Sequence, residues 1–98
     1  DLARLRQLDL RGVAITAAGR EQDFVCRFFA PNYGIDEDPV TGSAYTQLAP
    51  YWGKVMNKTE LYARQVSSRG GNVKCRLDGN RVAIAGQAVK FLEGRIEI

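Results

Sequence analysis

Residues 36–44, Asp-Glu-Asp-Pro-Val-Thr-Gly-Ser-Ala, hold the side chains best suited to chemistry. The three carboxylates end at Asp38, and a hydroxyl, a glycine and a second hydroxyl follow at Thr41, Gly42 and Ser43. If a helix begins here, its first backbone N–H groups lack intrahelical partners and, with the helix dipole, bind a carboxylate or phosphate. Gly42 would let that anion approach the backbone, while the two hydroxyls add donors. Asp38 would lie beside the anion, where it can take part in proton transfer.

The same segment also suits an ordinary helix start. Asp38 is a good N-cap and Pro39 a favoured first helical residue, and carboxylates near this end stabilise a helix without binding anything. The residues by themselves therefore leave a ligand site and a plain helix start both open. A buried helix whose polar end opens at the end of a curled sheet would favour the site, because it would form the floor of a pocket.

The turn Arg69-Gly70-Gly71 is a second candidate. Arg69 is able to hold a carboxylate, and the two glycines would let backbone amides point at a ligand. The alternative is a glycine-rich turn that carries a solvated arginine. The turn alone does not decide between these two interpretations.

Other sources of proton chemistry are few, since the chain contains no histidine, the commonest general base and metal ligand. The two cysteines, Cys26 and Cys75, lie among strand-forming residues and predict neither a disulfide framework nor a metal site. Both are interpreted as small buried apolar residues. Carboxylates, tyrosine, lysine or backbone groups must then carry any acid–base step, and no metal is expected.

The composition bears on the function class. The 98 residues carry 14 basic and 11 acidic side chains, a net charge of +3 that is spread along the chain. This mild excess favours a small anionic substrate over nucleic acid. Neither a run of about 18 apolar residues nor a secretory signal is present, so a cytoplasmic protein without membrane contact is expected. The start at Asp1 without methionine fits an engineered or processed start, or a piece of a longer protein.

Apolar spacing predicts the elements that must position these segments. A spacing of about four residues from Val40 to Met56 predicts one helix over about 39–56, bent at Pro50. This helix is apolar on nearly every side and is therefore expected to be buried nearly all round. Alternating residues predict strands at 13–17, 24–29, 61–66, 73–77, 81–85 and 87–92, after a short amphipathic turn or helix at 2–8 and with a loop at 31–38.

These elements together predict a single α+β domain over residues 1–98. A sheet that wraps around one central helix accounts for the order of strands and helix better than helices that flank a parallel sheet. The pair Asp78-Gly79 predicts a hairpin between the strands at 73–77 and 81–85. Large aromatic side chains fall on apolar positions and are assigned to the core: Tyr45, Tyr51, Trp52 and Tyr62.

Several spaced motifs resemble the PhzF-like family, the phenazine-biosynthesis-like proteins. They occur in the family's order at residues 27–31, 34–44, 48–52, 67–71 and 86–89, so the resemblance covers nearly the whole chain. It implies the diaminopimelate-epimerase-like fold, in which two similar domains each wrap a mixed or antiparallel β-barrel around a central helix and the active site lies between them. It also implies an isomerase that needs no cofactor and moves a proton on a small substrate bearing a carboxylate.

Residue by residue, the resemblance implies that Asp38 is the active-site aspartate. Thr41, Gly42 and Ser43 would hold the substrate carboxylate, and Arg69, Gly70 and Gly71 would line the cleft. Family members often carry histidine where this chain has Tyr45, which is interpreted as a change in the pocket lining.

The larger departure is length. Family members have a first domain that supplies the principal catalytic glutamate and a histidine-bearing loop, and neither has a counterpart here. The chain therefore resembles the second, C-terminal domain alone, and the resemblance leads us to expect further strands of that domain before Asp1.

Three hypotheses follow. The chain is an isomerase domain that stays incomplete without a partner half, or a non-catalytic module for small-anion binding or dimerisation. In the third, two copies associate across the cleft face and bring two Asp38 loops together. The sequence does not specify the substrate.

Overall fold

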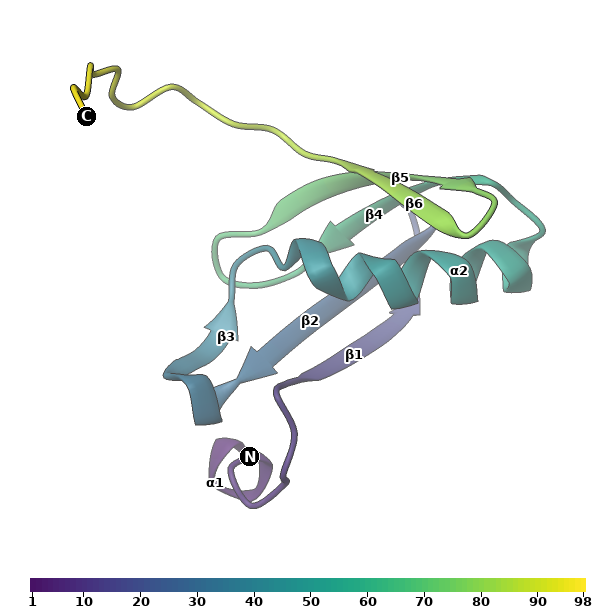
Figure 1. The fold of residues 1–98 in the computed structure, drawn as a ribbon. Helices are drawn as coiled ribbons and strands as arrows, with labels where there is room; N and C mark the ends of the chain where they lie inside the picture. Colours follow the sequence, from purple (N-terminus) through teal and green to yellow (C-terminus); the bar gives the residue numbers. More distant parts are fainter.

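The computed structural model describes residues 1–98, which form one mixed sheet with one long helix across it (Figure 1). The helices are α1 (Leu2–Leu5) and α2 (Tyr45–Met56), with 3₁₀ turns at Pro31–Tyr33 and Gly42–Ala44. The strands are β1 (Val13–Ala18), β2 (Phe24–Ala30), β3 (Ile35–Asp38), β4 (Glu60–Gln65), β5 (Gly71–Asp78) and β6 (Arg81–Ala85). The α+β prediction is confirmed.

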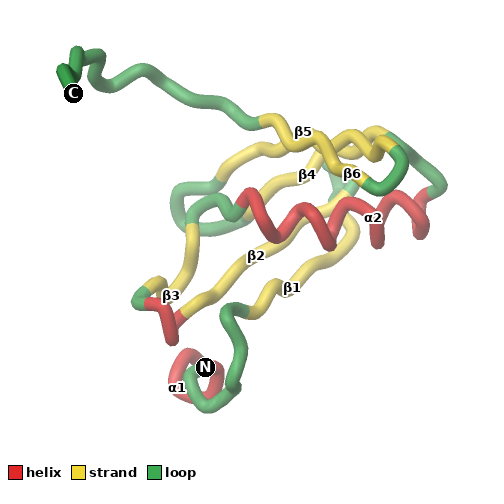
Figure 2. Tube along the Cα trace, viewed as in Figure 1, coloured by secondary structure: helices red, strands yellow, loops and turns green.

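The sheet runs in the order β1-β2-β4-β5-β6, and β3 pairs with β2 beside this path. Strands β2 and β4 are parallel, because α2 connects them across one face of the sheet, and the other neighbours are antiparallel. Figure 2 shows α2 lying along that face. The strands β1 and β6 end the sheet and do not pair with each other, so the barrel does not close.

The core lies between α2 and the face of the sheet it covers. Alternate residues of β2, β4 and β5 point toward the helix, as the period of two requires. The buried cluster consists of Phe24, Cys26, Tyr45, Leu48, Ala49, Trp52, Leu61, Ala63, Val73 and Cys75. Trp52 stacks on Phe24 with ring centroids 5.8 Å apart, and its indole N–H donates to Thr16 Oγ1 at 2.9 Å. The interpretation of both cysteines as buried apolar residues is confirmed.

The prediction that the helix is buried nearly all round is wrong. Only the face turned to the sheet is covered, since no second layer packs on the opposite face. Tyr51 and Val55 point away from the sheet and are 57% and 58% exposed. The assignment of Tyr51 and Tyr62 to the core is therefore wrong, since Tyr62 lies on the uncovered face of β4. The same assignment is confirmed for Tyr45 and Trp52, which are buried.

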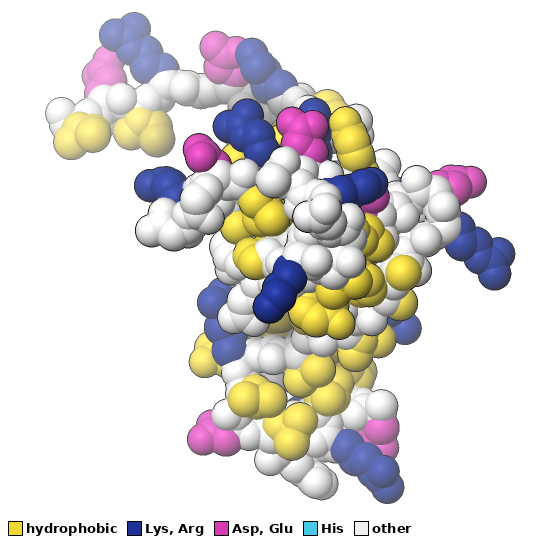
Figure 3. Space-filling model, turned by 90° about the vertical axis from the view of Figure 1, so that its right-hand side faces the viewer, with side chains coloured by type: hydrophobic (Ala, Val, Ile, Leu, Met, Phe, Trp, Pro, Cys, Tyr) yellow, Lys and Arg dark blue, Asp and Glu magenta, His cyan; other side chains and the backbone are white.

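The last predicted strand, residues 87–92, is not formed. The chain leaves β6 at Ala85 and runs outward without regular structure (Figure 1). No neighbouring strand offers its backbone groups a partner, so the strand-like alternation is not sufficient for a strand. Phe91 is 99% exposed in this tail. Figure 3 shows apolar side chains uncovered both on the body of the domain and on the tail.

The segment before α2 also differs from its prediction. Residues 35–38 form β3 rather than a loop, and α2 begins at Tyr45 rather than near Pro39. The residue before a proline disfavours helical backbone, so Asp38 remains extended and pairs with Phe28 of β2. No helix in the structure has both the length and the apolar character that a membrane crossing requires.

Candidate functional site

The segment from Asp38 to Ser43 connects the end of β3 to the start of the helical region. Thr41 keeps an extended backbone, with φ −116° and ψ 96°, and the 3₁₀ turn Gly42–Ala44 then continues into α2. Thr41 therefore takes the N-cap position that was predicted for Asp38. Asp38 instead ends a strand, one short loop away from the first helical amides.

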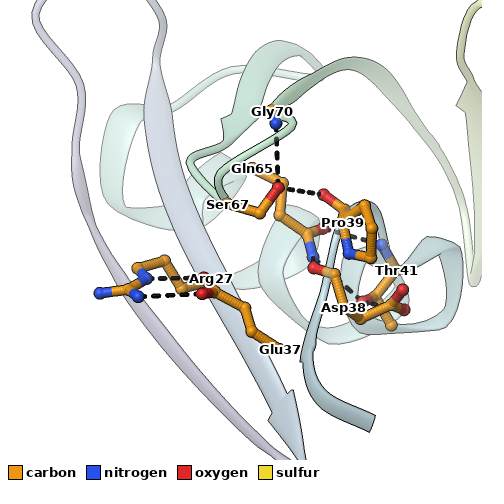
Figure 4. Close-up of polar contacts among 8 residues, drawn as sticks. All are labelled: Arg27, Glu37, Asp38, Pro39, Thr41, Gln65, Ser67 and Gly70. Atoms are coloured by element: carbon orange, nitrogen blue, oxygen red, sulfur yellow. Dashed lines mark hydrogen bonds and ion pairs between the residues drawn. The ribbon is translucent and has the colours of Figure 1, made fainter.

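The Asp38 side chain is half-buried and points back over this loop (Figure 4). The Thr41 hydroxyl donates to Asp38 Oδ2 at 2.6 Å. This distance lies in the range of charge-assisted O–H···O⁻ hydrogen bonds. Thr41 itself is only 7% exposed, so this bond is shielded from water.

The three consecutive carboxylates do not act together. Asp36 contacts Arg6 at 3.2 Å, and Glu37 forms a two-pronged ion pair with Arg27 at 2.7 and 3.0 Å. The hydrogen bonds from Arg27 hold the pKa of Glu37 below its usual value. Figure 4 shows this pair apart from the contacts around Asp38. Of the acidic run, Asp38 alone belongs to the loop before α2.

Gln65, at the end of β4, holds the loop in place. Its side-chain amide donates to the Asp38 carbonyl at 2.8 Å and to Thr41 Oγ1 at 3.1 Å. Its oxygen accepts the Thr41 N–H at 2.8 Å. Gln65 is fully buried. Gln65 was not among the residues predicted for the site. Its position carries a signal, because it is a polar side chain on the buried side of β4, two residues after the buried Ala63.

Tyr45 completes this buried network. Its hydroxyl donates to Gln65 Oε1 at 3.4 Å and accepts from Cys26 Sγ at 3.4 Å. Burial, assisted by the contact with Cys26, raises the pKa of Tyr45 strongly. The prediction that Tyr45 lines the pocket is wrong for this chain, because its ring lies in the core beneath the loop with no exposed surface.

The turn at residues 67–71 packs against the other side of the loop. The Ser67 hydroxyl donates to the Pro39 carbonyl at 2.9 Å and accepts the Gly70 N–H at 3.0 Å. A Cβ at Gly71 would overlap the side chain of Val40, so this glycine allows the close approach of loop and strand. Gly70 has a φ of +72°, which favours glycine.

Arg69 is exposed and takes part in no ion pair of the structure. The Gly70 amide is already bonded to Ser67. The turn therefore supports the loop, and direct contact of Arg69, Gly70 and Gly71 with a substrate stays a prediction.

Gly42 and Ser43 lie at the exposed start of the helical region. The Thr41 and Ala44 amides donate to Gln65 Oε1 and to the Thr41 carbonyl, whereas no hydrogen bond within the chain involves the Gly42 or Ser43 amide. A Cβ at Gly42 would meet no atom within 4 Å, so the space in front of it is open. These two amides are therefore free to receive an anion, as helix N-termini do.

A cavity of about 290 Å³ opens beside Ser43, between the start of α2 and the strands β1 and β2. Arg11 and Phe28 contribute to its lining. Arg11, which was not among the predicted site residues, brings a positive charge to the cavity. The arrangement combines two free amides, a hydroxyl and a cation at the start of α2, with a carboxylate one loop away.

Comparisons with known proteins agree on one family. A family model described as phenazine biosynthesis-like protein matches residues 1–94. Two uncharacterized isomerases of Pseudomonas aeruginosa are 56% and 49% identical over 98 residues, covering 100% of this chain and 38% of each relative. The structure of a PhzC/PhzF protein from Clostridium difficile superposes with a TM-score of 0.87 and 46% identity, again covering 100% of this chain and 38% of that one. The chain thus spans 38% of the length of these relatives.

Proposed function

The chain belongs to the phenazine biosynthesis-like protein family, as its spaced motifs indicated, and on this basis we propose that it is part of an isomerase acting on a small carboxylate. The observation that carries this proposal is the pairing of an acid–base group with an anion site on a single loop. Asp38 lies at one end of the loop, and the free amides of Gly42 and Ser43 lie at the other.

The start of α2 would hold the substrate carboxylate. The helix dipole and the two free amides favour an anion there, and the Ser43 hydroxyl adds a donor. Arg11, across the neighbouring cavity, adds favourable charge. Thr41 would act on the buried side of the loop, because its hydroxyl and its amide are both engaged with Asp38 and Gln65.

Asp38 would then give or take the proton. A carboxylate fixed near the bound substrate is able to transfer a proton to or from carbon without a cofactor, if the geometry is held. Within this chain no second carboxylate of the acidic run faces the loop, so we propose that a partner half, or a second copy of the chain, supplies the other acid–base group. A module that binds the anion without catalysis is the alternative, and it predicts binding without proton exchange.

A binding experiment tests the anion site. In an NMR titration with acetate and with but-3-enoate, the amide signals of Gly42 and Ser43 are expected to shift most. Gly42→Val should abolish these shifts while the fold persists, since a side chain there fills the open space without a clash inside the chain. Gly86→Val is the matched control, because a Cβ at Gly86 also meets no neighbouring atom. Binding that survives Gly42→Val would show that the site is wrong.

A further inference from the structure

The structure points to a role that the proposed function does not assign: we infer that Gln65 is a positioning residue, which fixes the Thr41 hydroxyl as a donor to Asp38 Oδ2 and leaves Oδ1 as the oxygen that exchanges the proton. The catalytic part of this inference rests on the proposed function. The hydrogen-bond arrangement itself is independent of it and is testable without any substrate.

Two contacts of 2.8 Å fix the orientation of the Gln65 side-chain amide. A backbone N–H only donates, so the atom 2.8 Å from the Thr41 nitrogen must be the Gln65 oxygen. A backbone carbonyl only accepts, so the atom 2.8 Å from the Asp38 carbonyl must be the Gln65 nitrogen. The two obligatory partners leave only one orientation of the side chain.

The oriented Gln65 amide sets the direction of the Thr41 hydroxyl. One Gln65 N–H goes to the Asp38 carbonyl and the other goes to Thr41 Oγ1 at 3.1 Å. The hydroxyl oxygen accepts this second bond, so its single proton is free for its other neighbour, Asp38 Oδ2 at 2.6 Å. The Tyr45 hydroxyl occupies the remaining acceptor position of Gln65, which completes the four hydrogen bonds of the amide. Gln65 therefore has no freedom to rotate without leaving buried groups unpaired, which is costly.

The two carboxyl oxygens of Asp38 differ as a result. Because Oδ2 accepts the Thr41 hydrogen bond, and a protonated carboxyl oxygen is the weaker acceptor, this contact favours Oδ1 as the oxygen that carries a proton. The side-chain hydrogen bonds of Asp38 involve Oδ2 alone, so Oδ1 has no partner within the chain. Gln65 touches neither the exposed amides of Gly42 and Ser43 nor the open space before them. Loss of the Gln65 side-chain amide is therefore expected to impair proton transfer rather than carboxylate binding.

The experiment compares four variants. Gln65→Met keeps the length and the apolar part of the side chain and removes all four hydrogen bonds. Thr41→Val removes the hydroxyl, whereas Thr41→Ser keeps the hydroxyl and removes only the methyl group. Val73→Ala is the control, a change in the same core on the neighbouring strand and away from the loop. Two readouts use the chain itself: the ¹³C shift of the Asp38 carboxyl and the exchange of the Thr41 hydroxyl proton with water. The third, deuterium incorporation into but-3-enoate in D₂O, is measured with each variant placed in the matching segment of the 56%-identical isomerase.

Gln65→Met is expected to speed exchange of the Thr41 hydroxyl proton by roughly tenfold, which corresponds to one lost hydrogen bond. It should also displace the Asp38 carboxyl signal as Thr41→Val does, while Thr41→Ser and Val73→Ala retain the original signal. For deuterium incorporation, kcat should fall about 100-fold with KM nearly unchanged, as expected when a reacting group is misplaced.

An unchanged Asp38 signal in Gln65→Met, or an equal change in Val73→Ala, would overturn the inference. A rise in KM with unchanged kcat would also overturn it. If the unaltered chain fails to exchange deuterium when it replaces the matching segment of the 56%-identical isomerase, the proposed function is contradicted. In that case the hydroxyl and carboxyl signals still decide the role of Gln65.

Discussion

Single residues in this chain owe their chemistry to burial more than to their type. Asp38 shares its acidic run with Asp36 and Glu37, yet only Asp38 is held by a buried network. Cys26 and Cys75 lie in the core near Tyr45, where loss of a proton would place a charge without water. Burial raises the pKa of Cys26, and burial together with the nearby Cys26 raises the pKa of Cys75 from 9.0 to about 11.

Alkaline conditions should therefore destabilise the fold. The Cys75 thiol of the unfolded chain loses its proton near pH 9, whereas the folded chain keeps it until about pH 11. The unfolded state binds fewer protons in this window, so the free energy of unfolding is expected to fall as the pH rises from 9 to 11. Urea titrations at several pH values measure this slope. Cys75→Ala should make the free energy of unfolding fall less steeply with pH, although Cys26 and Tyr45 still contribute in the same direction. An unaltered slope would contradict the raised pKa of Cys75.

The sequence grouped the candidate residues of the proposed site but not the residues that support them. Asp38, Thr41, Gly42 and Ser43 are adjacent in the chain, so local spacing was sufficient to group them. Gln65 joins them from 24 residues beyond Thr41, through pairing of strands that local patterns do not specify. A polar side chain on the buried face of a strand indicates a buried hydrogen-bond partner. Which residue is that partner is known only once the fold is known.

Among the elements, α2 shows what apolar spacing predicts and what it does not. The spacing of four predicted the helix, yet it did not distinguish a helix with one covered face from one that is buried all round. That difference depends on how many layers pack against it, and here only the sheet does. The start of α2 was misplaced because Pro39 and the pairing of Asp38 with Phe28 keep the chain extended.

Two apolar residues of α2 should accordingly differ in their contribution to stability. Trp52 is 9% exposed and stacks on Phe24, so Trp52→Ala is expected to cost about 3–5 kcal/mol of unfolding free energy. Val55, on the opposite face, is 58% exposed, and Val55→Ala should change stability by less than about 0.5 kcal/mol. Chemical denaturation followed by circular dichroism measures both. Similar costs for the two variants would show that another layer covers the outer face of α2.

The contact between the start of β5 and the loop before α2 gives a second prediction at this scale. Gly71→Ala introduces a methyl group that overlaps Val40, so it should destabilise the fold by about 1–3 kcal/mol. Val40→Ala removes the obstructing methyl groups, and the double variant should recover most of the loss. Urea unfolding of the two single variants and of the double variant is measured, with Gly86→Ala as the unhindered control. These values give the coupling free energy between the changes at Gly71 and Val40. If the two losses of unfolding free energy simply add in the double variant, Gly71 and Val40 are not in contact.

At the scale of the whole molecule, the domain leaves much apolar surface uncovered. The outer face of α2 and the tail after β6 expose Tyr51, Val55, Val89 and Phe91. The alternation at residues 87–92 predicted a strand, and the structure lacks a strand edge that pairs with it. The sheet likewise ends at β1 and β6 without closing into the barrel that the family resemblance implied. Patterns within one chain do not show which surfaces another part of a protein covers.

A chimera can show directly whether this chain supplies the aspartate of a proton-transferring site. Because the chain aligns over its full length with 38% of a Pseudomonas aeruginosa isomerase at 56% identity, it can replace that segment in a chimera. Deuterium incorporation into but-3-enoate is then measured in D₂O for the chimera and for its Asp38→Asn form. The account predicts exchange by the chimera, and loss of exchange with retained carboxylate binding in Asp38→Asn. An Asp38→Asn chimera that exchanges deuterium at the original rate would contradict it.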